Sequence, residues 1–409
     1  MGIHVISMCA ILAIIPLYWL PDLPDLHLVW LLIAAGVALS VQQRKWLRFS
    51  GLALLFMCWG ILAAQESVWP MNHLTKAPQQ AEVVITATDG ATMHQGKIVS
   101  LNGERVWGAM GVALYGNYLP QNVCVGQRWA MTLRLRAVHG ELNDGGYDSQ
   151  KNAFARHQTL SGRFSHAALV DEGCSLRAQY LTSLQNTLSA YQWGPVILGL
   201  GMGERLSVSR EIKNLMRDTG TMHLMAISGL HIALAASVIW FLARGIQFFL
   251  PGRWIIWQIP LLAGLIFAAF YAWLTGLQPP ALRTVIALVV LAALKMSGRQ
   301  WSPWQVWLTC VAAILIFDPL AVLSQSLALS AFAVAALIFW YQWLPLPHWQ
   351  RGRCLRPLAT LVYLQVGMLL LLLPLQVLIF HGFSLSSLVA NLFAVPLVTF
   401  ISVPLILLG

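Results

Sequence analysis

Residues 358–379 read LATLVYLQVGMLLLLLPLQVLI, a run without a single charged side chain. A helix of about 20 apolar residues is long enough to cross the hydrocarbon core of a bilayer. Lipid offers backbone amides no hydrogen-bond partner, and a continuous apolar run lacks the alternation of a β-barrel strand. The run therefore predicts a transmembrane helix.

Runs of this kind recur along the chain, which is 58% hydrophobic and only 10% charged, against roughly a quarter charged in a soluble domain. The nine others are residues 5–20, 28–41, 50–64, 223–243, 255–274, 281–296, 306–317, 321–340 and 385–408. Several are shorter than a straight span requires, so we expect recruited flanks or broken helices. The sequence predicts a polytopic α-helical membrane protein of about ten transmembrane helices.

Basic side chains are concentrated in every second loop between these runs. The loops after the second, fourth, sixth and eighth runs hold ten of them and no acidic residue, namely Arg44, Lys45, Arg48, Arg244, Arg253, Lys295, Arg299, Arg351, Arg353 and Arg356. With 25 basic and 15 acidic residues in the chain, these loops account for the whole net charge of +10. Such an excess marks the cytoplasmic side. The N-terminus is therefore predicted inside and residues 66–220 outside, and the charge reports topology rather than a DNA-binding surface.

The outside segment changes to short β-rich runs between residues 82 and 138. Asn102 and Gly103 separate two of these runs, and this pair is typical of a type I′ hairpin because both residues tolerate positive φ. Residues 131–137 alternate between apolar and polar side chains, as a half-buried strand does. We expect a small antiparallel β domain of barrel type. Ten basic and nine acidic residues in 66–180 give it no overall attraction to DNA.

Two amphipathic segments follow the β-rich runs. Residues 176–191 are predicted to lie along the membrane or under the β domain, and residues 204–218 along the membrane or at the entrance of a pathway. The predicted organisation is three N-terminal helices in residues 1–65, the β domain in 66–175, interfacial helices in 176–220 and a helical core in 221–409.

Cysteine placement agrees with this topology. Only Cys124 and Cys174 lie outside, where an oxidising compartment permits a disulfide. We expect the two to pair; the alternative is two buried thiols that pack as small apolar side chains.

A Ser–Gly pair interrupts the fourth run between two histidines, in HLMAISGLHI at residues 223–232. A broken helix at membrane depth is tolerated only beside protein or a water-filled cavity. His223, Ser228, Gly229 and His231 are therefore candidates for lining a polar pathway. The alternative is a glycine that permits close helix packing and histidines bonded to neighbouring helices.

Five further polar residues within or next to the later runs extend this set: Arg283, Asp318, Gln325, Ser330 and Asn391. Arg283 either points into a cavity or reaches the outer surface, and Asp318 either caps a helix or lines the pathway. Asn391 lines the pathway or joins helices by a hydrogen bond.

Catalytic signatures are missing from the sequence, which has no nucleophile elbow, phosphate loop, zinc motif or convergent carboxylate pair. We expect no catalytic residue, metal or cofactor in this chain and no enzymatic activity from it. A transporter of a lipid or small polar solute remains an alternative, although such proteins more often show inverted repeats. A membrane-embedded hydrolase would need a nucleophile and a base.

The polar segments together resemble the ComEC family of competence proteins. HLMAISGLHI is close to the family stretch H-L-x-A-I-S-G-L-H-[IV]. Further matches are residues 280–283 to P-x-x-R, 318–330 to D-P…Q-L-S, 391–396 to N-x-x-x-x-P and 143–148 to N-x-G-G-[FY]-D.

The resemblance implies an inner-membrane channel that internalises single-stranded DNA in natural transformation, with a periplasmic OB-like domain that guides the strand and suits a Cys124–Cys174 disulfide. Implied partners are single-stranded DNA, the lipid bilayer, a periplasmic DNA receptor, a cytoplasmic helicase or DNA-binding protein, and a second copy in a homodimer. Family members commonly carry a C-terminal metallo-β-lactamase-like domain. The sequence ends at Gly409 without its H-x-H-x-D-H motif, so we expect a truncated chain whose full-length form carries that nuclease-like hydrolase domain.

Overall fold

The computed structural model describes residues 2–20, 22–72, 74–75, 77–89, 92–116, 119, 123–140, 148–205, 208–225, 227–345, 356–382 and 386–408. The chain forms two compact units, Met1–Ser183 with Leu315–Gln325, and Leu184–Ile314 with Ser326–Gly409. Some sequence features lie outside the described residues: most of the 143–148 turn, Ala226, the basic loop residues Arg351 and Arg353, Cys354 and Gly409.

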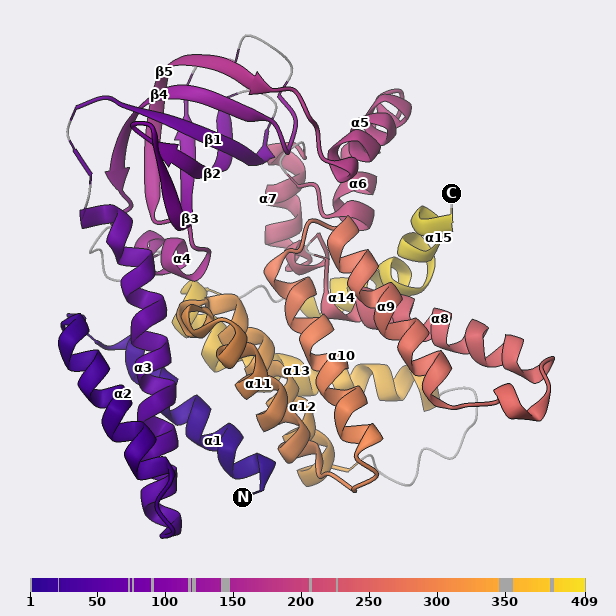
Figure 1. Ribbon diagram of the computed structural model, residues 1–409. Helices are drawn as coiled ribbons and strands as arrows, with labels where there is room; N and C mark the ends of the chain where they lie inside the picture. Colours follow the sequence, from indigo (N-terminus) through magenta and orange to yellow (C-terminus); the bar gives the residue numbers. More distant parts are fainter. Residues whose placement is uncertain are drawn as a thin grey trace. The chain divides into compact units, whose positions relative to one another are not determined.

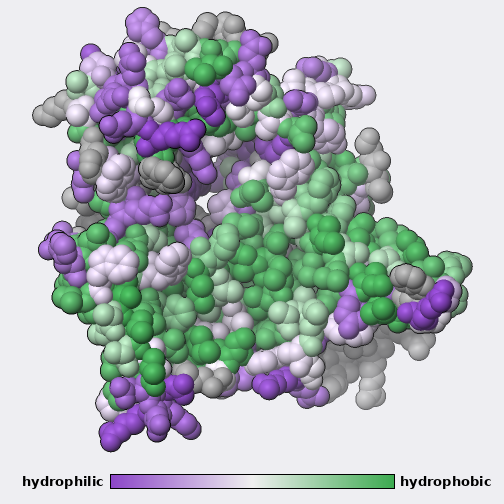
Figure 2. All heavy atoms as spheres, in the orientation of Figure 1, coloured by the Kyte–Doolittle hydropathy of each residue, from purple (hydrophilic) through white to green (hydrophobic). Residues whose placement is uncertain are grey.

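Six helical segments of the described chain are long and apolar enough to cross a membrane. They are α3 (Lys45–Asn72), α8 (Gly229–Phe248), α10 (Pro279–Met296), α12 (Gln325–Trp343), α13 (Arg356–Phe380) and the segment formed by α14 (Ser386–Leu397), a π-helical turn (Val398–Ser402) and α15 (Val403–Leu408). Four shorter apolar helices are α1 with its 3₁₀ extension (Ile3–Tyr18), α2 (Leu26–Ser40), α9 (Gln258–Leu274) and α11 (Pro303–Phe317). Hydrophobic side chains cover much of the helices' visible surface, as expected of lipid-facing helices (Figure 2). The chain is a multi-pass α-helical membrane protein, and the count of about ten spans stays a prediction.

The second and third helices approach each other closely through small residues. A Cβ on Gly51 of α3 would lie 2.6 Å from the carbonyl oxygen of Gly36 in α2, so only glycine fits this crossing. Val29, Cys58 and Ile61 are buried beside it. Small residues promote helix association in lipid because they let the backbones come together.

The inserted domain is a closed five-stranded barrel (Figure 1). Its strands are β1 (Gln79–Thr88), β2 (Met93–Leu101), β3 (Glu104–Tyr115), β4 (Arg128–Ala137) and β5 (Leu160–Asp171), in the order β1-β2-β3-β5-β4. Only β3 and β5 run parallel. Alternate side chains fill the interior, with Trp129, Leu114 and Leu133 fully buried. The predicted antiparallel domain is therefore a barrel, and the predicted hairpin is present, with φ of 52° at Asn102 and 87° at Gly103.

Two details of the barrel differ from the sequence prediction. Val123 falls within the stretch 82–138 in which β-rich runs were predicted, but it lies in the loop before β4. We did not predict β5, whose glycine, serines and alanines give a weak alternation and whose pairing with β4 contains a register shift. Its hydrogen bonds to β3 and β4, rather than its own pattern, make it a strand.

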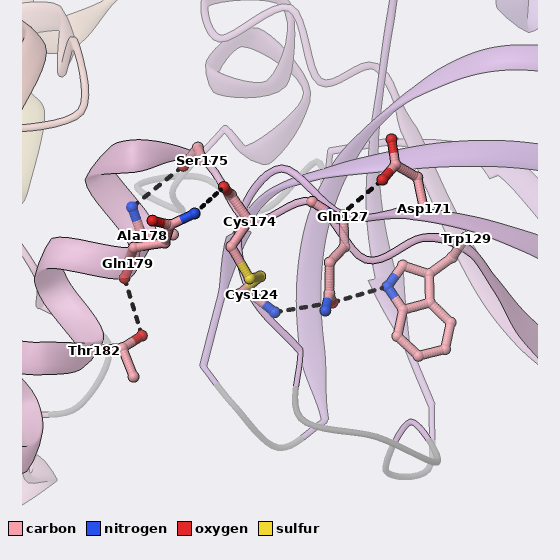
Figure 3. The surroundings of a disulfide bond; sticks show 10 residues. Cys124, Gln127, Trp129, Asp171, Cys174, Ser175, Ala178, Gln179 and Thr182 are labelled. Atoms are coloured by element: carbon pink, nitrogen blue, oxygen red, sulfur yellow. Dashed lines mark hydrogen bonds between the residues drawn. A yellow bond between two sulfur atoms is a disulfide. The ribbon is translucent and has the colours of Figure 1, made fainter.

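A disulfide between Cys124 and Cys174 joins the loop before β4 to the chain that leaves β5 (Figure 3). The Cα atoms are 5.8 Å apart and the cysteines are 50 residues apart in sequence. Gln127 Oε1 accepts hydrogen bonds from the Cys124 amide at 3.0 Å and from the Trp129 indole at 3.2 Å. The predicted pair thus fixes the barrel wall to the start of α5 (Leu176–Leu188).

The predicted run 321–340 is not one helix. A 3₁₀ turn at Pro319–Leu323 is followed by extended backbone at Ser324, and α12 begins at Gln325. Leu320 and Ala321 are buried in the first unit, where Trp59 Nε1 of α3 donates a 3.0 Å hydrogen bond to the Ile316 carbonyl. These contacts favour the turn, so residues 321–324 do not form the start of the helix that the hydropathy pattern predicts.

The second unit begins with two short helices, α6 (Gly194–Met202) and α7 (Arg210–Asp218), and a 3₁₀ turn at Met222–Leu224. α7 falls within the predicted amphipathic segment, with Ser209 as its N-cap. The apolar core of this unit lies between α8, α9 and α10, where Tyr271 and Ile232 are fully buried. This core supports the start of α8.

Candidate functional site

α8 begins at Gly229, where the sequence predicts a break. Ser228 has extended backbone with ψ of 154°, and its hydroxyl accepts a 3.4 Å hydrogen bond from the His231 amide. An N-cap serine of this kind satisfies one of the amides that a helix start leaves unpaired. Met225 and Ile227 on the approach are buried, so the helix starts within packed protein.

The first turn of α8 lies against the second turn of α10. A Cβ added to Gly229 would overlap the hydroxyl oxygen of Thr284. Glycine fits at this position because it has only a hydrogen in place of a side chain. The Thr284 hydroxyl donates a 3.0 Å hydrogen bond to the Pro280 carbonyl, which fixes its orientation.

α12 meets the same turn of α10. Arg283 Nη1 donates a 3.1 Å hydrogen bond to Ser326 Oγ, and Ser326 is the second residue of α12. Arg283 has no carboxylate partner among the residues that the structure describes. We call Gly229, Arg283, Thr284 and Ser326 the helix-start junction. Helix N-termini carry partial positive charge, so the junction combines two helix starts with an unneutralised guanidinium.

His231 lies two residues after Gly229, in the first turn of α8, and is only 1% exposed. Neither ring nitrogen has a hydrogen-bond partner among the residues that the structure describes. A buried polar group without a partner is costly, roughly 1–3 kcal/mol, so its environment is either functional or able to rearrange. His231 does not line an open path in this conformation.

Two of the other predicted residues of the second unit bond to backbone carbonyls close to them in sequence. His223 Nδ1 is 3.0 Å from the Gly220 carbonyl oxygen, and the Ser330 hydroxyl donates to Leu327 of its own helix at 3.1 Å. The side-chain oxygen of Asn391 in α14 is buried and has no hydrogen-bond partner within the described part of the chain. Gln325 begins α12 beside Ser326.

Asp318 belongs to the first unit. It occupies the N-cap position of the 3₁₀ turn but makes no side-chain cap hydrogen bond. Its Oδ1 lies 3.3 Å from Nε2 of His157. His157 is in the short segment that connects α4 (Ser149–Ala155) to β5. The hydrogen bond to Asp318 raises the pKa of His157, and burial of the imidazole opposes this effect. Sequence reasoning missed His157, whose left-handed φ of 54° has no signature in a single sequence.

Metal-binding residues do not gather in the part of the chain that the structure describes, where no three His, Cys, Asp or Glu side chains could share an ion. The polar groups of the junction are a guanidinium, hydroxyls and helix amides. The guanidinium and the helix amides only donate hydrogen bonds and a hydroxyl can donate or accept, so the set suits an anion.

Comparison with known proteins covers both units. The family model described as "Competence protein" matches residues 200–409. The chain is 59% identical to "Uncharacterized protein YcaI" of Escherichia coli over 407 residues, 100% of this chain and 54% of that protein. It is 33% identical to "Recombination protein 2" of Haemophilus influenzae, over 91% of this chain and 46% of that protein. It is 30% identical to "Competence protein ComA" of Neisseria gonorrhoeae, over 85% of this chain and 50% of that protein.

The chain thus spans about half the length of these curated relatives. No solved structure matches it. The family model includes the whole helix-start junction, and the relatives' similarity extends over the barrel as well. The chain belongs to the ComEC family of competence proteins.

Proposed function

We propose that this chain conducts single-stranded DNA across the bacterial inner membrane during natural transformation. The observation that carries the proposal is the helix-start junction, where Arg283 lies without a carboxylate partner among the described residues at the starts of α8 and α12. A DNA strand carries one phosphate per nucleotide, and helix amides and arginines are the groups that bind phosphate. The names of the Haemophilus and Neisseria relatives fit the same role.

The barrel fits a guiding role on the outer side of the membrane. Its closed five-stranded order supports an OB-type fold, a class that binds oligonucleotides. The Cys124–Cys174 disulfide suits the periplasm, where disulfides persist. We therefore place the N-terminus in the cytoplasm and residues 66–220 in the periplasm, after the first three of about ten spans.

A channel of this kind guides the strand without driving it. The proposal therefore includes a periplasmic receptor that delivers the strand and a cytoplasmic helicase or DNA-binding protein that draws it inward. The chain itself acts without a cofactor and without catalysis. A homodimer remains part of the proposal.

Uptake of fluorescently labelled DNA tests the proposal, in a strain that is first proved transformable. Deleting the gene should abolish uptake. Gly229→Ala in the chromosomal gene should reduce uptake by roughly tenfold or more, because overpacking a helix contact costs about 1–3 kcal/mol and about 1.4 kcal/mol is a factor of ten. Gly229→Ala with Thr284→Ala should restore uptake, because the overlapping hydroxyl is gone.

Gly245→Ala is the matched control, since Gly245 is in the same helix and an added Cβ would meet nothing within 4 Å. Immunoblotting of membranes must show equal amounts of all variants. Normal uptake in the deletion strain would refute the proposed function.

A further inference from the structure

Three arginines lie on one outer face of the barrel, on the adjacent strands β4 and β5. Arg134 is directly opposite Arg163 in the ladder, and Arg136 lies two residues further along β4. All three side chains are exposed. Across the other edge of β5, Arg163 is opposite Tyr115 of β3, a residue that is 43% exposed. We call Arg134, Arg136 and Arg163 the arginine cluster.

The arginine cluster is unfavourable for the barrel by itself. Like charges directly opposite each other destabilise a sheet, and none of the three arginines has a carboxylate partner among the described residues. By contrast, Arg128 at the other end of the same strand lies 3.9 Å from Glu82. Charged side chains that lower the stability of a fold and have no structural partner are typical of a binding site.

A hollow of about 540 Å³ adjoins the arginine cluster along β1, β4 and β5. Thr132 and His166 face each other across the ladder at its near end, next to Arg134 and Arg163. Ala130 and Ala168, which are opposite each other in the ladder, also line it, and Glu82 and Ser100 add hydrogen-bonding groups. Two residues along a strand span about 7 Å, so the hollow lies within one nucleotide of the arginines.

We propose that this face of the barrel is a binding site for single-stranded nucleic acid, in which the arginine cluster holds phosphates and the hollow holds a sugar and base. The charge of the arginines is complementary to the backbone, and Tyr115 offers a ring on which a base stacks. The carboxylate of Glu82 disfavours phosphate inside the hollow and accepts hydrogen bonds from a base. The inference rests on the proposed function and assigns it a docking site outside the membrane.

The test measures binding of fluorescent oligo(dT) to the whole chain in nanodiscs, across a salt series. Arg163→Thr should weaken binding about fivefold and reduce the slope of log affinity against log salt by about 0.7, the value for one phosphate contact on a single strand. Threonine suits a strand, so the thermal midpoint of the variant should not fall. Arg156→Thr is the control, because Arg156 is an exposed arginine at the end of α4, outside this face.

Ala168→Ile separates the hollow from the charges. The larger side chain should weaken binding of oligo(dT) and leave binding of polyphosphate unchanged, because polyphosphate has no base or sugar. Two results would overturn the inference. One is oligo(dT) binding that is unchanged in Arg163→Thr. The other is an Arg163→Thr variant that no longer binds phosphatidylglycerol micelles but still binds oligo(dT). The proposed function fails separately, if uptake of labelled DNA does not depend on the gene.

Discussion

The arginine cluster of the barrel and the helix-start junction place arginine side chains in different environments. On the barrel, Arg134 and Arg163 face each other without a partner on an exposed surface. At the junction, the single guanidinium of Arg283 donates to Ser326, and glycine brings the neighbouring helix into contact. Both sites lack a carboxylate among the described residues.

The difference in the number of arginines at the two sites follows from what surrounds them. Water screens like charges, so the repulsion between two exposed arginines is weak and the site can hold several of them. Between apolar helices each unpaired polar group is costly, so one arginine is placed where hydroxyls and helix amides surround it. This difference is the reason why our proposals assign capture of a polyanion to the barrel and its passage to the junction.

The largest effect that tests this comparison concerns the covalent link of the barrel. Reducing the Cys124–Cys174 disulfide, or Cys124→Ser with Cys174→Ser, should lower the free energy of unfolding of the barrel by about 4 kcal/mol. The reason is the chain entropy released when a loop of this length is opened. Proteolysis of the barrel in a urea series, with and without reductant, measures the change.

The control for this prediction is Cys9→Ser, because Cys9 of α1 is unpaired and its loss should leave the urea midpoint of the barrel unchanged. Labelling of Cys124 and Cys174 by a thiol reagent without reductant would contradict the disulfide. An unchanged midpoint after reduction would show that the β ladder alone determines barrel stability.

A smaller effect concerns the ion pair between His157 and Asp318. The pKa of His157 is raised in the folded chain, so the pair is fully formed below pH about 6.5 and its contribution is lost as pH rises through the raised value. Both side chains are partly exposed, so we expect only about 0.5 kcal/mol. Glu66 also favours the protonated ring and Lys97 opposes it.

Thermal unfolding between pH 5.5 and 8, a range chosen to bracket roughly the ordinary pKa of histidine, measures this contribution. The wild type should lose stability towards high pH relative to Asp318→Asn, which removes the charge and keeps the shape. Parallel pH profiles of the two proteins would show that the pair contributes nothing.

The break at the start of α8 was predictable from sequence, and its neighbours were not. Serine followed by glycine inside an apolar run is unfavourable for a continuous helix, so residue types alone indicate Ser228 and Gly229. Thr284 and Ser326 are ordinary residues in their own helices and become part of the site only through packing. Asp318 was predicted as a polar candidate, but its partner His157 is brought to it by the fold.

The barrel shows the same limit. Alternation in residues 131–137 predicts that Arg134 and Arg136 share a face. The third arginine of the cluster lies on β5, which has little alternation of its own, and its position opposite Arg134 depends on the register shift near Thr132. The numbers of basic and acidic residues in the insert are therefore nearly equal, although the fold brings three arginines together on one face.

Photo-crosslinking to DNA during uptake tests the proposed pathway most directly. A photoreactive phenylalanine derivative replaces Ser326 at the junction, or Val334, which is eight residues further along the same helix and 48% exposed. Labelled DNA arrested during entry should crosslink at position 326 and not at position 334, in cells whose uptake is otherwise retained. Equal crosslinking at both positions, or none at position 326 while DNA still enters, would contradict passage of the strand past the helix-start junction.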